Sequence, residues 1–283
     1  MFMLELVFTF NHFAVNMLYE KFMNFCKKNL KISIWNINGY KCKGFNKFAD
    51  QDFLDKLSSQ DIFCLQETHC DQEQCLDIKE FPNPVHLIRP KNKKTGRRFG
   101  GLSIYIRNHV RAGVKFLTHA SNDYIWLKLC KSYFKLHDDL YICFAYIPPG
   151  NSSFSKKLDY DILELIENDI VKYSQLGHIL LAGDLNSRIS QENDFIISDS
   201  DKHIPLYSDY KFDSVSLTMR RLNKNKIINT RGKQLLAMCI SSHLRILNGR
   251  TFGDLLGSFT CHQPLGSSTE DYMFNSLSNI FQG

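Results

Sequence analysis

Carboxylate and amide side chains follow two runs of apolar residues in this sequence. Asp184 and Asn186 come just after the run His178–Ala182, and Glu67 comes directly after Ile62–Gln66. Carboxylate and amide oxygens are ligands that Mg²⁺ accepts, and a carboxylate can also activate a water molecule. These are the residue types that metal-assisted hydrolysis of a phosphodiester requires.

Each of these positions also has a purely structural explanation. Gly183-Asp184 fits a tight turn with a capping aspartate, and Glu67 fits the acidic start of a helix. The stretch Trp35–Gly39 fits a plain turn, and Tyr146 fits the end of a strand stopped by two prolines. No one of these motifs identifies a reaction by itself.

The elements expected around these residues are short strands with helices between some of them. The expected strands are Lys31–Asn36, Ile62–Gln66, Leu102–Ile106, Val114–Leu117, Tyr124–Leu129, Leu140–Tyr146, His178–Ala182, Leu244–Asn248, Ser258–His262 and Asp271–Phe274. The expected helices are Lys47–Leu57, Leu158–Tyr173 and Gly232–Ser242. This mixture predicts an α/β fold with two packed sheets, in which polar residues at strand ends converge on one rim.

Length and composition indicate an ordinary globular protein of one domain. The 283 residues carry a net charge of +6 and nine scattered cysteines, which favours a reducing compartment, the nucleus or the cytoplasm. Residues 1–29 lack the features of a signal peptide or a membrane span, so we expect a weakly ordered or helical extension. We expect residues 30–283 to form the functional domain, as a monomer without a membrane partner.

Taken together, the motifs WNINGY, LQETH, YIPP and GDLNSR resemble the endonuclease/exonuclease/phosphatase family. The later stretches NTRGKQLL, SSHLRILNGRTFGD and GSFTCHQPLGSSTEDYMF are similar to the apurinic-type endonuclease domain of non-LTR retrotransposons. This resemblance implies a DNase I-like two-sheet α/β sandwich, Mg²⁺ or Mn²⁺ as cofactor, and DNA as the nicked substrate. Relatives that act on phosphoinositides, sphingomyelin or RNA tails keep other phosphodiester substrates open.

The resemblance also implies roles for the residues at the strand ends. Asn36 and Glu67 would hold the metal ion, and Tyr146 would orient the scissile phosphate. Asp184 would position or deprotonate the attacking water, and Asn186 would hydrogen-bond the phosphate.

Further roles follow from the same resemblance. Asp271 would orient the imidazole of a catalytic histidine. Asn38, Arg188, Thr260 and Ser268 would contact the substrate, the last two along the DNA-facing edge. The residue before Asp271 is usually apolar in the family, whereas this chain has a glutamate there.

The sequence departs from the family pattern at the catalytic histidine. The family's Ser-Asp-His segment follows the Asp-Tyr motif, but no such segment occurs between Asp271 and Gly283. Ser200–His203 has similar letters, but it precedes Asp271. We therefore expect a domain truncated at its C-terminus, lacking the final strand. The alternative to an active enzyme is an impaired remnant that binds nucleic acid or metal without turnover.

Basic residues gather in two polar stretches that could contact DNA phosphates or simply be solvated. The first stretch contains Lys91, Lys93, Lys94, Arg97 and Arg98, and the second contains Arg220, Arg221, Lys224, Lys226, Arg231 and Lys233.

Overall fold

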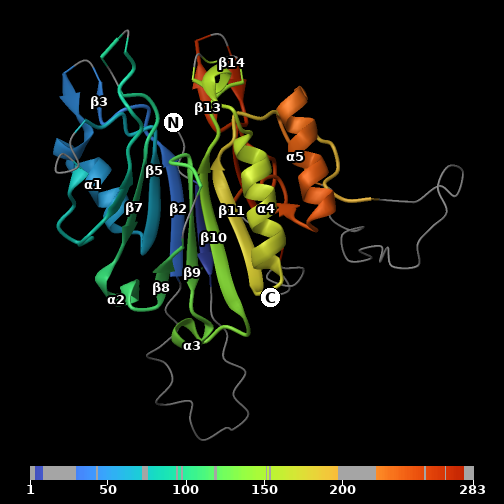
Figure 1. The fold of residues 1–283 in the computed structure, drawn as a ribbon, viewed down its shortest axis with the longest axis horizontal. Coiled ribbons are helices and arrows are strands. Elements are labelled where there is room, and N and C mark those ends of the chain that lie inside the picture. The colour runs from blue at the N-terminus through green and yellow to red at the C-terminus, as the bar shows by residue number, and fades with distance from the viewer. Residues whose placement is uncertain are drawn as a thin grey trace, which may run out of the picture. The chain divides into compact units, whose positions relative to one another are not determined.

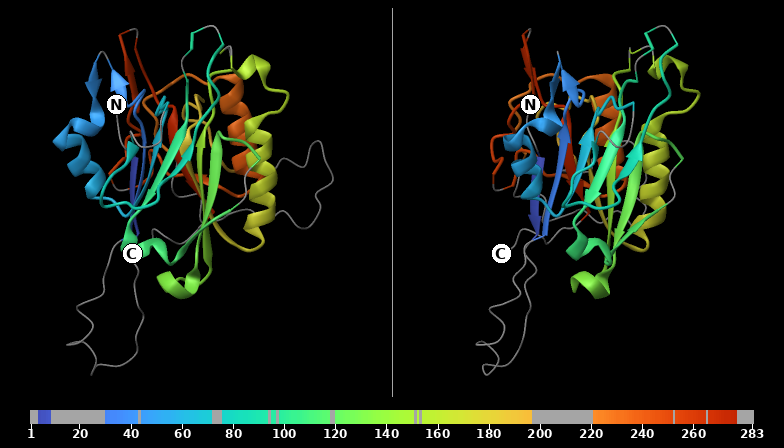
Figure 2. Two further views of the ribbon diagram at one scale, coloured as in Figure 1. Left: turned by 60° about the vertical axis from the view of Figure 1, so that its left-hand side comes forward. Right: turned by 90° about the vertical axis from the view of Figure 1, so that its left-hand side faces the viewer.

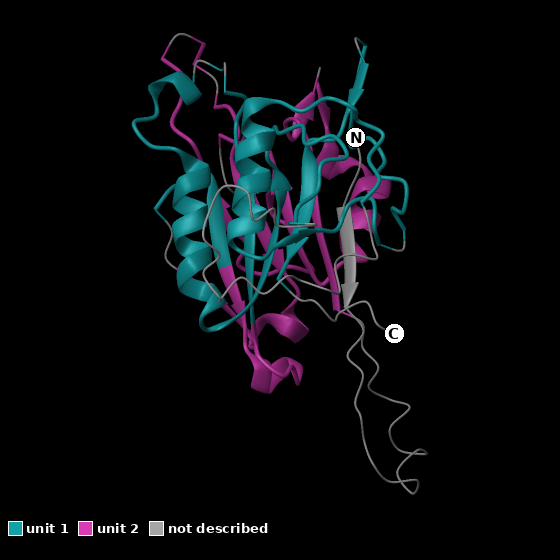
Figure 3. Cartoon of the chain, turned by 90° about the vertical axis from the view of Figure 1, so that its right-hand side faces the viewer, with its two compact units in different colours: residues 1–2, 118–126, 140–283 teal, residues 3–117, 127–139 magenta. Residues whose placement is uncertain are grey.

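The computed structural model describes residues 4–8 and 30–276, except residues 43, 72–75, 94, 97, 118–119, 151, 153, 197–220, 252 and 265. The chain divides into two compact units (Figure 3). Unit 1 comprises residues 1–2, 118–126 and 140–283, and unit 2 comprises residues 3–117 and 127–139.

Unit 2 is built on a five-stranded sheet with the order β1-β2-β5-β7-β6. Its strands are β1 (Leu4–Phe8), β2 (Leu30–Asn36), β5 (Ile62–Gln66), β6 (Val85–Leu87) and β7 (Leu102–Ile106). Strands β2 and β5 run parallel, with Asn36 opposite Gln66. The carboxyl ends of parallel strands meet at the same edge, so Asn36 and Glu67 leave the sheet side by side.

Helix α1 (Gln51–Ser58) covers one face of this sheet. Its Phe53 and Leu57 pack with Phe63 and Leu65 of β5 and with Tyr105 of β7 in one buried cluster. The predicted helix Lys47–Leu57 is interrupted, because the Asp50 side chain accepts hydrogen bonds from the backbone N–H groups of residues 52 and 53. This N-cap starts α1 at residue 51 and leaves Lys47–Ala49 as a short 3₁₀ turn.

Strand β1 lies within residues 1–29, the stretch expected to be a weakly ordered or helical extension. Leu4–Phe8 form a strand that pairs antiparallel with β2, with Leu4 opposite Ile34 and Phe8 opposite Leu30. A strand at a sheet edge is stabilised by its partner, which lies far away in the sequence. The remainder of that stretch lies outside the described residues.

The shorter elements of unit 2 connect and flank this sheet. They are β3 (Lys41–Cys42), β4 (Phe45–Asn46), α2 (Asn108–Arg111), β8 (Val114–Phe116) and α3 (Lys131–Phe134). Strand β8 pairs with residues 127–129 of β9 (Tyr124–Leu129).

Unit 1 holds strands β12, β15, β11, β10 and the first half of β9, in this order across the sheet (Figures 1 and 2). The bounds are β10 (Asp139–Tyr146), β11 (Gly177–Asp184), β12 (Arg245–Ile246) and β15 (Asp271–Asn275). Helices α4 (Ile162–Ser174) and α5 (Thr230–Ser241) lie side by side, and α4 contacts β11. Strands β13 (Cys261–Gln263) and β14 (Gly266–Ser268) form a separate hairpin.

The mixed α/β class predicted from the sequence is confirmed, and most predicted strands are present. Helix α4 begins at Ile162 rather than at Leu158, because Asp161 caps it through the N–H of Leu163. The strand expected at Ser258–His262 is displaced to Cys261–Gln263. In the part of the chain that the structure describes, every helix is too short or too polar to cross a lipid bilayer.

Candidate active site

Asn36 and Glu67 form the first part of the candidate site, in unit 2. Asn36 is the last residue of β2, and its Nδ2 donates a hydrogen bond of 3.1 Å to Oε1 of Glu67. Glu67 has a φ of 50°, in the left-handed region that a glutamate seldom adopts. Such a conformation costs free energy, and residues that keep it often lie at functional sites.

Backbone hydrogen bonds fix the two strand exits to each other. The N–H of Ile37 donates to the carbonyl of Gln66, and the N–H of Gly39 donates to the carbonyl of Glu67 at 2.6 Å. Asn38 is exposed with a φ of 47°, and its N–H donates to Oδ1 of Asn36 at 3.0 Å. These bonds hold Asn36 and Glu67 in place before any ligand binds.

Lys47 stabilises the loop that follows Asn36, a role that was not predicted from the sequence. Its Nζ donates hydrogen bonds to the carbonyls of Ile37 and Gly39, the second at 2.8 Å. Burial lowers the pKa of this ammonium below its ordinary value. Its position in a polar loop carried no sequence signal.

His69 also lies closer to Glu67 than the sequence suggested. Its Nε2 is 3.5 Å from Oε2 of Glu67, and its ring meets Phe99 edge to face with a centroid distance of 5.8 Å. The contact with Glu67 makes this histidine a neighbour of the candidate metal ligand. The LQETH motif itself was the signal that could have identified it.

The oxygen donors of Glu67 and Asn36 fit Mg²⁺. Within the described ranges, no group of three or more His, Cys, Asp or Glu residues could hold a metal ion. Mg²⁺ usually keeps several water ligands and needs only one or two carboxylates from the protein. Glu67 and Asn36 supply one carboxylate and one amide from adjacent strand ends, which meets that requirement.

Unit 1 carries the second group of predicted residues at one end of its sheet. Tyr146 ends β10, Asp184 ends β11 and Asp271 begins β15. Asp184 and Asp271 are directly opposite each other in the antiparallel β11–β15 pair, and both are buried. Opposite residues of such a pair share one face of the sheet, so the two carboxylates are neighbours.

The close approach of strand β10 explains why a glycine precedes Asp184. A Cβ built at this position would lie 1.8 Å from the carbonyl oxygen of Ala145 on the neighbouring strand β10. Only glycine permits this approach of the two backbones. The close contact brings Asp184 next to the end of β10, where its carbonyl accepts a hydrogen bond from the N–H of Ile147 at 2.9 Å.

Hydrogen bonds to Asp184 and Ile147 hold Asn186 in a turn after β11. Its N–H donates to Oδ1 of Asp184 at 3.0 Å, and its φ is 46°. Its Nδ2 donates to the carbonyl of Ile147 at 2.9 Å. An amide nitrogen carries two N–H groups, so one remains for a ligand.

Thr260 and Ser268, predicted along the DNA-facing edge, are 7% and 4% exposed. Oγ1 of Thr260 accepts hydrogen bonds from the N–H groups of Glu270 and Asp271, both at 3.1 Å. Oγ of Ser268 donates to Oε1 of Glu270 at 2.8 Å. The two hydroxyls therefore position the start of β15 within the chain.

Arg188 pairs with Glu270, and its backbone is fixed to the start of α5. The Nε of Arg188 lies 3.5 Å from Oε1 of Glu270, and the two side chains are 36% and 18% exposed. Oδ1 of Asn229 accepts hydrogen bonds from the N–H of Gly232 at 2.7 Å and from that of Arg188 at 3.2 Å. Asn229 thus caps α5 and connects it to the strand exit of β11.

Replacing Asn229 by alanine should lower the free energy of unfolding by about 1–2 kcal/mol, because it removes a helix cap and leaves the Arg188 N–H without this acceptor. Urea denaturation measures this change. Asn229→Asp keeps the acceptor oxygen and serves as the matched control. Equal midpoints for the parent and the alanine variant would rule out a stabilising role for the cap.

The segment before α5 alternates buried and exposed polar residues. Arg221, Asn223 and Asn225 are buried, whereas Lys224 and Lys226 are exposed. Arg221 belongs to the basic stretch that could contact phosphates or be solvated, but it is 3% exposed and its Nη2 donates to backbone carbonyls at 2.7 and 2.9 Å. Burial lowers the pKa of its guanidinium, and its role is to anchor the segment.

In the first basic stretch, Lys91 and Lys93 are exposed, and Nε of Arg98 lies 3.4 Å from Oδ1 of Asp71. Residues 94, 97, 220 and 200–203 lie outside the described residues.

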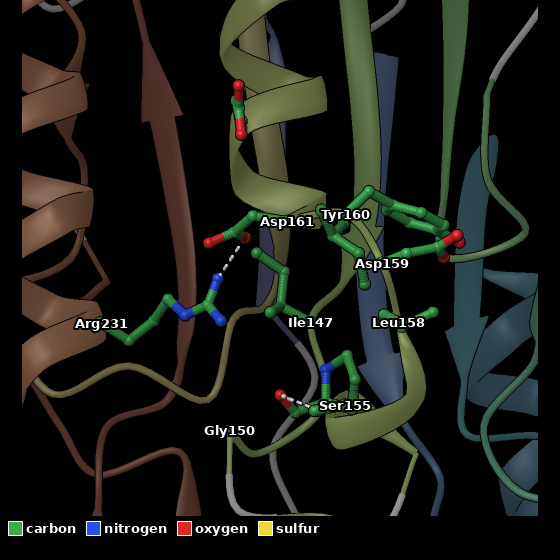
Figure 4. A pocket seen from close by; sticks show the side chains of 11 residues that line it. Ile147, Gly150, Ser155, Leu158, Asp159, Tyr160, Asp161 and Arg231 are labelled. Carbon is green, nitrogen blue, oxygen red and sulfur yellow. Dashed lines mark hydrogen bonds and ion pairs between the residues drawn. The ribbon is translucent and has the colours of Figure 1, made fainter.

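A cavity of about 440 Å³ lies beside the loop that follows β10 (Figure 4). Its wall includes Ile147 and an ion pair of 2.6 Å between Arg231 at the start of α5 and Asp161 at the start of α4. Asp159 and Glu164 add two more carboxylates to the lining. This surplus of negative charge makes the cavity a poor place for a phosphate.

The structure thus brings the predicted site residues together in two groups. Asn36, Asn38 and Glu67 lie together in unit 2. Unit 1 holds the other group, which comprises Tyr146, Asp184, Asn186, Arg188, Thr260, Ser268 and Asp271.

Known proteins give the same assignment of fold. The catalytic domain of Xenopus laevis APE2 is similar at 14% identity, over 88% of this chain and 83% of that chain, with a TM-score of 0.56. Humanized D. rerio TDP2 is similar at 13% identity, over 87% and 82% of the two chains, with a TM-score of 0.51. No curated protein sequence matches. The model of the Endonuclease/Exonuclease/phosphatase family matches residues 34–274, and the chain belongs to this family.

Proposed function

We propose that this protein is a Mg²⁺-dependent phosphodiesterase that nicks DNA, of the type found in non-LTR retrotransposons. The observation that carries the proposal is the pair of buried carboxylates, Asp184 and Asp271, at opposite positions of β11 and β15. Like charges directly opposite each other destabilise a sheet. A pair that is kept at this cost is typical of a catalytic site.

Glu67 and Asn36 would hold the metal ion, which when bound supplies charge neutralisation at the phosphate. The hydrogen bond between the two side chains and the backbone hydrogen bonds between the two strand ends would keep these oxygen donors at a fixed separation. Preorganised ligands avoid the cost of ordering the site during the reaction.

Asp184 would orient the attacking water and accept its proton. Its Oδ1 already accepts the N–H of Asn186, which fixes the direction of the carboxylate. The second N–H of the Asn186 amide would donate to a phosphate oxygen, and Tyr146 would orient the same group. In the family that the sequence resembles, the residue at the position of Asp271 orients a catalytic histidine, and residues 272–283 of this sequence contain no histidine.

Exposed lysines near the site residues of unit 1 support DNA as the substrate. Lys224 and Lys226 are exposed. The segment that carries them is hydrogen-bonded to residues 190–192, which follow Asn186 closely in the chain. Lysines held in this way can contact backbone phosphates without reading the sequence. The stretches NTRGKQLL and GRTFGD support the retrotransposon branch over the lipid-acting relatives.

Plasmid nicking tests the proposal directly. We expect supercoiled DNA to be converted to the open-circular form with Mg²⁺, and the activity to be lost with EDTA and restored by excess Mg²⁺. A soluble phosphoinositide, sphingomyelin and an oligoadenylate RNA, assayed for release of phosphate, phosphocholine and nucleotides respectively, test the other substrates of the family. Binding of DNA without nicking, or hydrolysis of another substrate alone, would contradict the proposal.

A further inference from the structure

Glu270 occupies a position where a negative charge is unexpected in a protein that binds DNA. It directly precedes Asp271, at the end of the sheet that also carries Asp184. Its backbone carbonyl accepts a hydrogen bond from the N–H of Leu185 at 3.0 Å, and its N–H donates to Thr260. The backbone of Glu270 is therefore fixed against both strand ends.

The side chain of Glu270 connects two of the residues predicted to contact the substrate. Its Oε1 accepts the hydroxyl of Ser268 at 2.8 Å and lies 3.5 Å from Nε of Arg188. Ser268 is buried, so it holds the carboxylate in a defined place. Arg188 is the more exposed partner, and its charge is balanced by Glu270 in the structure as it stands.

Three carboxylates come together at this end of the sheet, because Asp271 lies opposite Asp184 in the β11–β15 pair and Glu270 directly precedes Asp271. A third carboxylate beside Asp184 and Asp271 would repel a phosphate unless a cation offsets it.

We propose that Glu270 is a specificity-determining residue, which holds Arg188 in an ion pair that a DNA phosphate must displace before Arg188 can bind it. The inference rests on the proposed function. The partners of this ion pair are both partly exposed, and such ion pairs are weak, so a well-placed phosphate can compete with the carboxylate. Arg188 then adds affinity only where a DNA phosphate displaces Glu270, and this limits the non-specific binding of DNA.

Salt dependence of DNA binding provides the test, because each phosphate contact adds about 0.9 to the slope of log K against log [salt]. Binding of a labelled duplex is measured by fluorescence anisotropy in EDTA, so that no hydrolysis occurs. We expect Glu270→Gln to steepen the slope by about 0.9 and to tighten binding by up to about eightfold at 0.1 M salt. For a duplex of arbitrary sequence, whose phosphates do not displace Glu270, Arg188→Gln alone should leave the slope unchanged, whereas Arg188→Gln added to Glu270→Gln should restore the parental slope.

A matched control removes one negative charge elsewhere in the same unit. Glu167 on α4 accepts a hydrogen bond from Ser241, and Glu167→Gln should leave the slope unchanged. Urea denaturation of each variant shows whether it is folded. If the parent binds DNA but Glu270→Gln weakens binding or leaves the slope unaltered, the inference fails and the proposed function stands. If the parent does not bind DNA, both are wrong.

Discussion

Replacing Asp184 by asparagine should reduce the rate of DNA nicking by about 10³-fold, the range that removal of a general base usually costs. The asparagine keeps an oxygen that can accept the N–H of Asn186, so the turn after β11 is retained. It also removes one of two like charges at the β11–β15 pair, so stability should be unchanged or slightly higher. Single-turnover nicking with saturating Mg²⁺, together with thermal denaturation, measures both effects.

A second variant distinguishes the role of the residues in unit 2 from that of the residues in unit 1. Glu67→Gln keeps an acceptor for Asn36 but loses the charge that a metal ion needs, so it should raise the Mg²⁺ concentration for half-maximal rate by at least about tenfold. Asp184→Asn should leave that concentration unchanged. Asp55→Asn, on the exposed side of α1, is the control for loss of an acidic charge. Nicking by both site variants at the parental rate would show that the site is assigned to the wrong residues.

Replacing Gly183 by alanine should destabilise the fold by about 3 kcal/mol or more, because the new methyl group would overlap the backbone of Ala145. Backbone cannot move aside as a side chain can, so β10 and β11 would have to separate. A change of this size lowers the melting temperature by roughly 6–12 °C in a protein of this length. Differential scanning calorimetry measures the shift.

Gly150 offers the matched comparison for this substitution. Nothing lies within 4 Å of a Cβ built there, and its backbone is not left-handed. Gly150→Ala should therefore leave the melting temperature within about 1 °C of the parent, since exposed substitutions seldom change stability much. A Gly183→Ala protein as stable as Gly150→Ala would mean that the strands do not approach as closely as the structure has them.

The strands that the sequence predicted best are those whose own residues determine them. Ile62–Gln66, Leu102–Ile106 and Tyr124–Leu129 are apolar runs, and their ends were predicted to the residue. The ends of helices α1 and α4 were not, because Asp50 and Asp161 override apolar periodicity by capping. Strand β1 depends on pairing with β2, a long-range contact that no local pattern shows.

Some contacts of the candidate site could likewise be predicted from the sequence, and others could not. The approach of Asn36 to Glu67 follows from two strand ends, and it could be predicted once the strands were recognised. The ion pair between Arg188 and Glu270 joins residues from distant parts of the chain, and the hydroxyls of Thr260 and Ser268 proved to be buried. Charge in a sequence shows which residues could bind a phosphate, but only packing shows which of them are already engaged.

The parallel pairing of β2 with β5 also determines when the proposed metal site can form during folding. Its two donors come from strands joined by α1, and they meet only when residues 32–36 have paired with residues 62–66. A shift of that register by one residue would turn the side chains of a strand to the opposite face and separate the donors. An ion that binds only the correctly paired strands would therefore select that register and stabilise unit 2 by mass action.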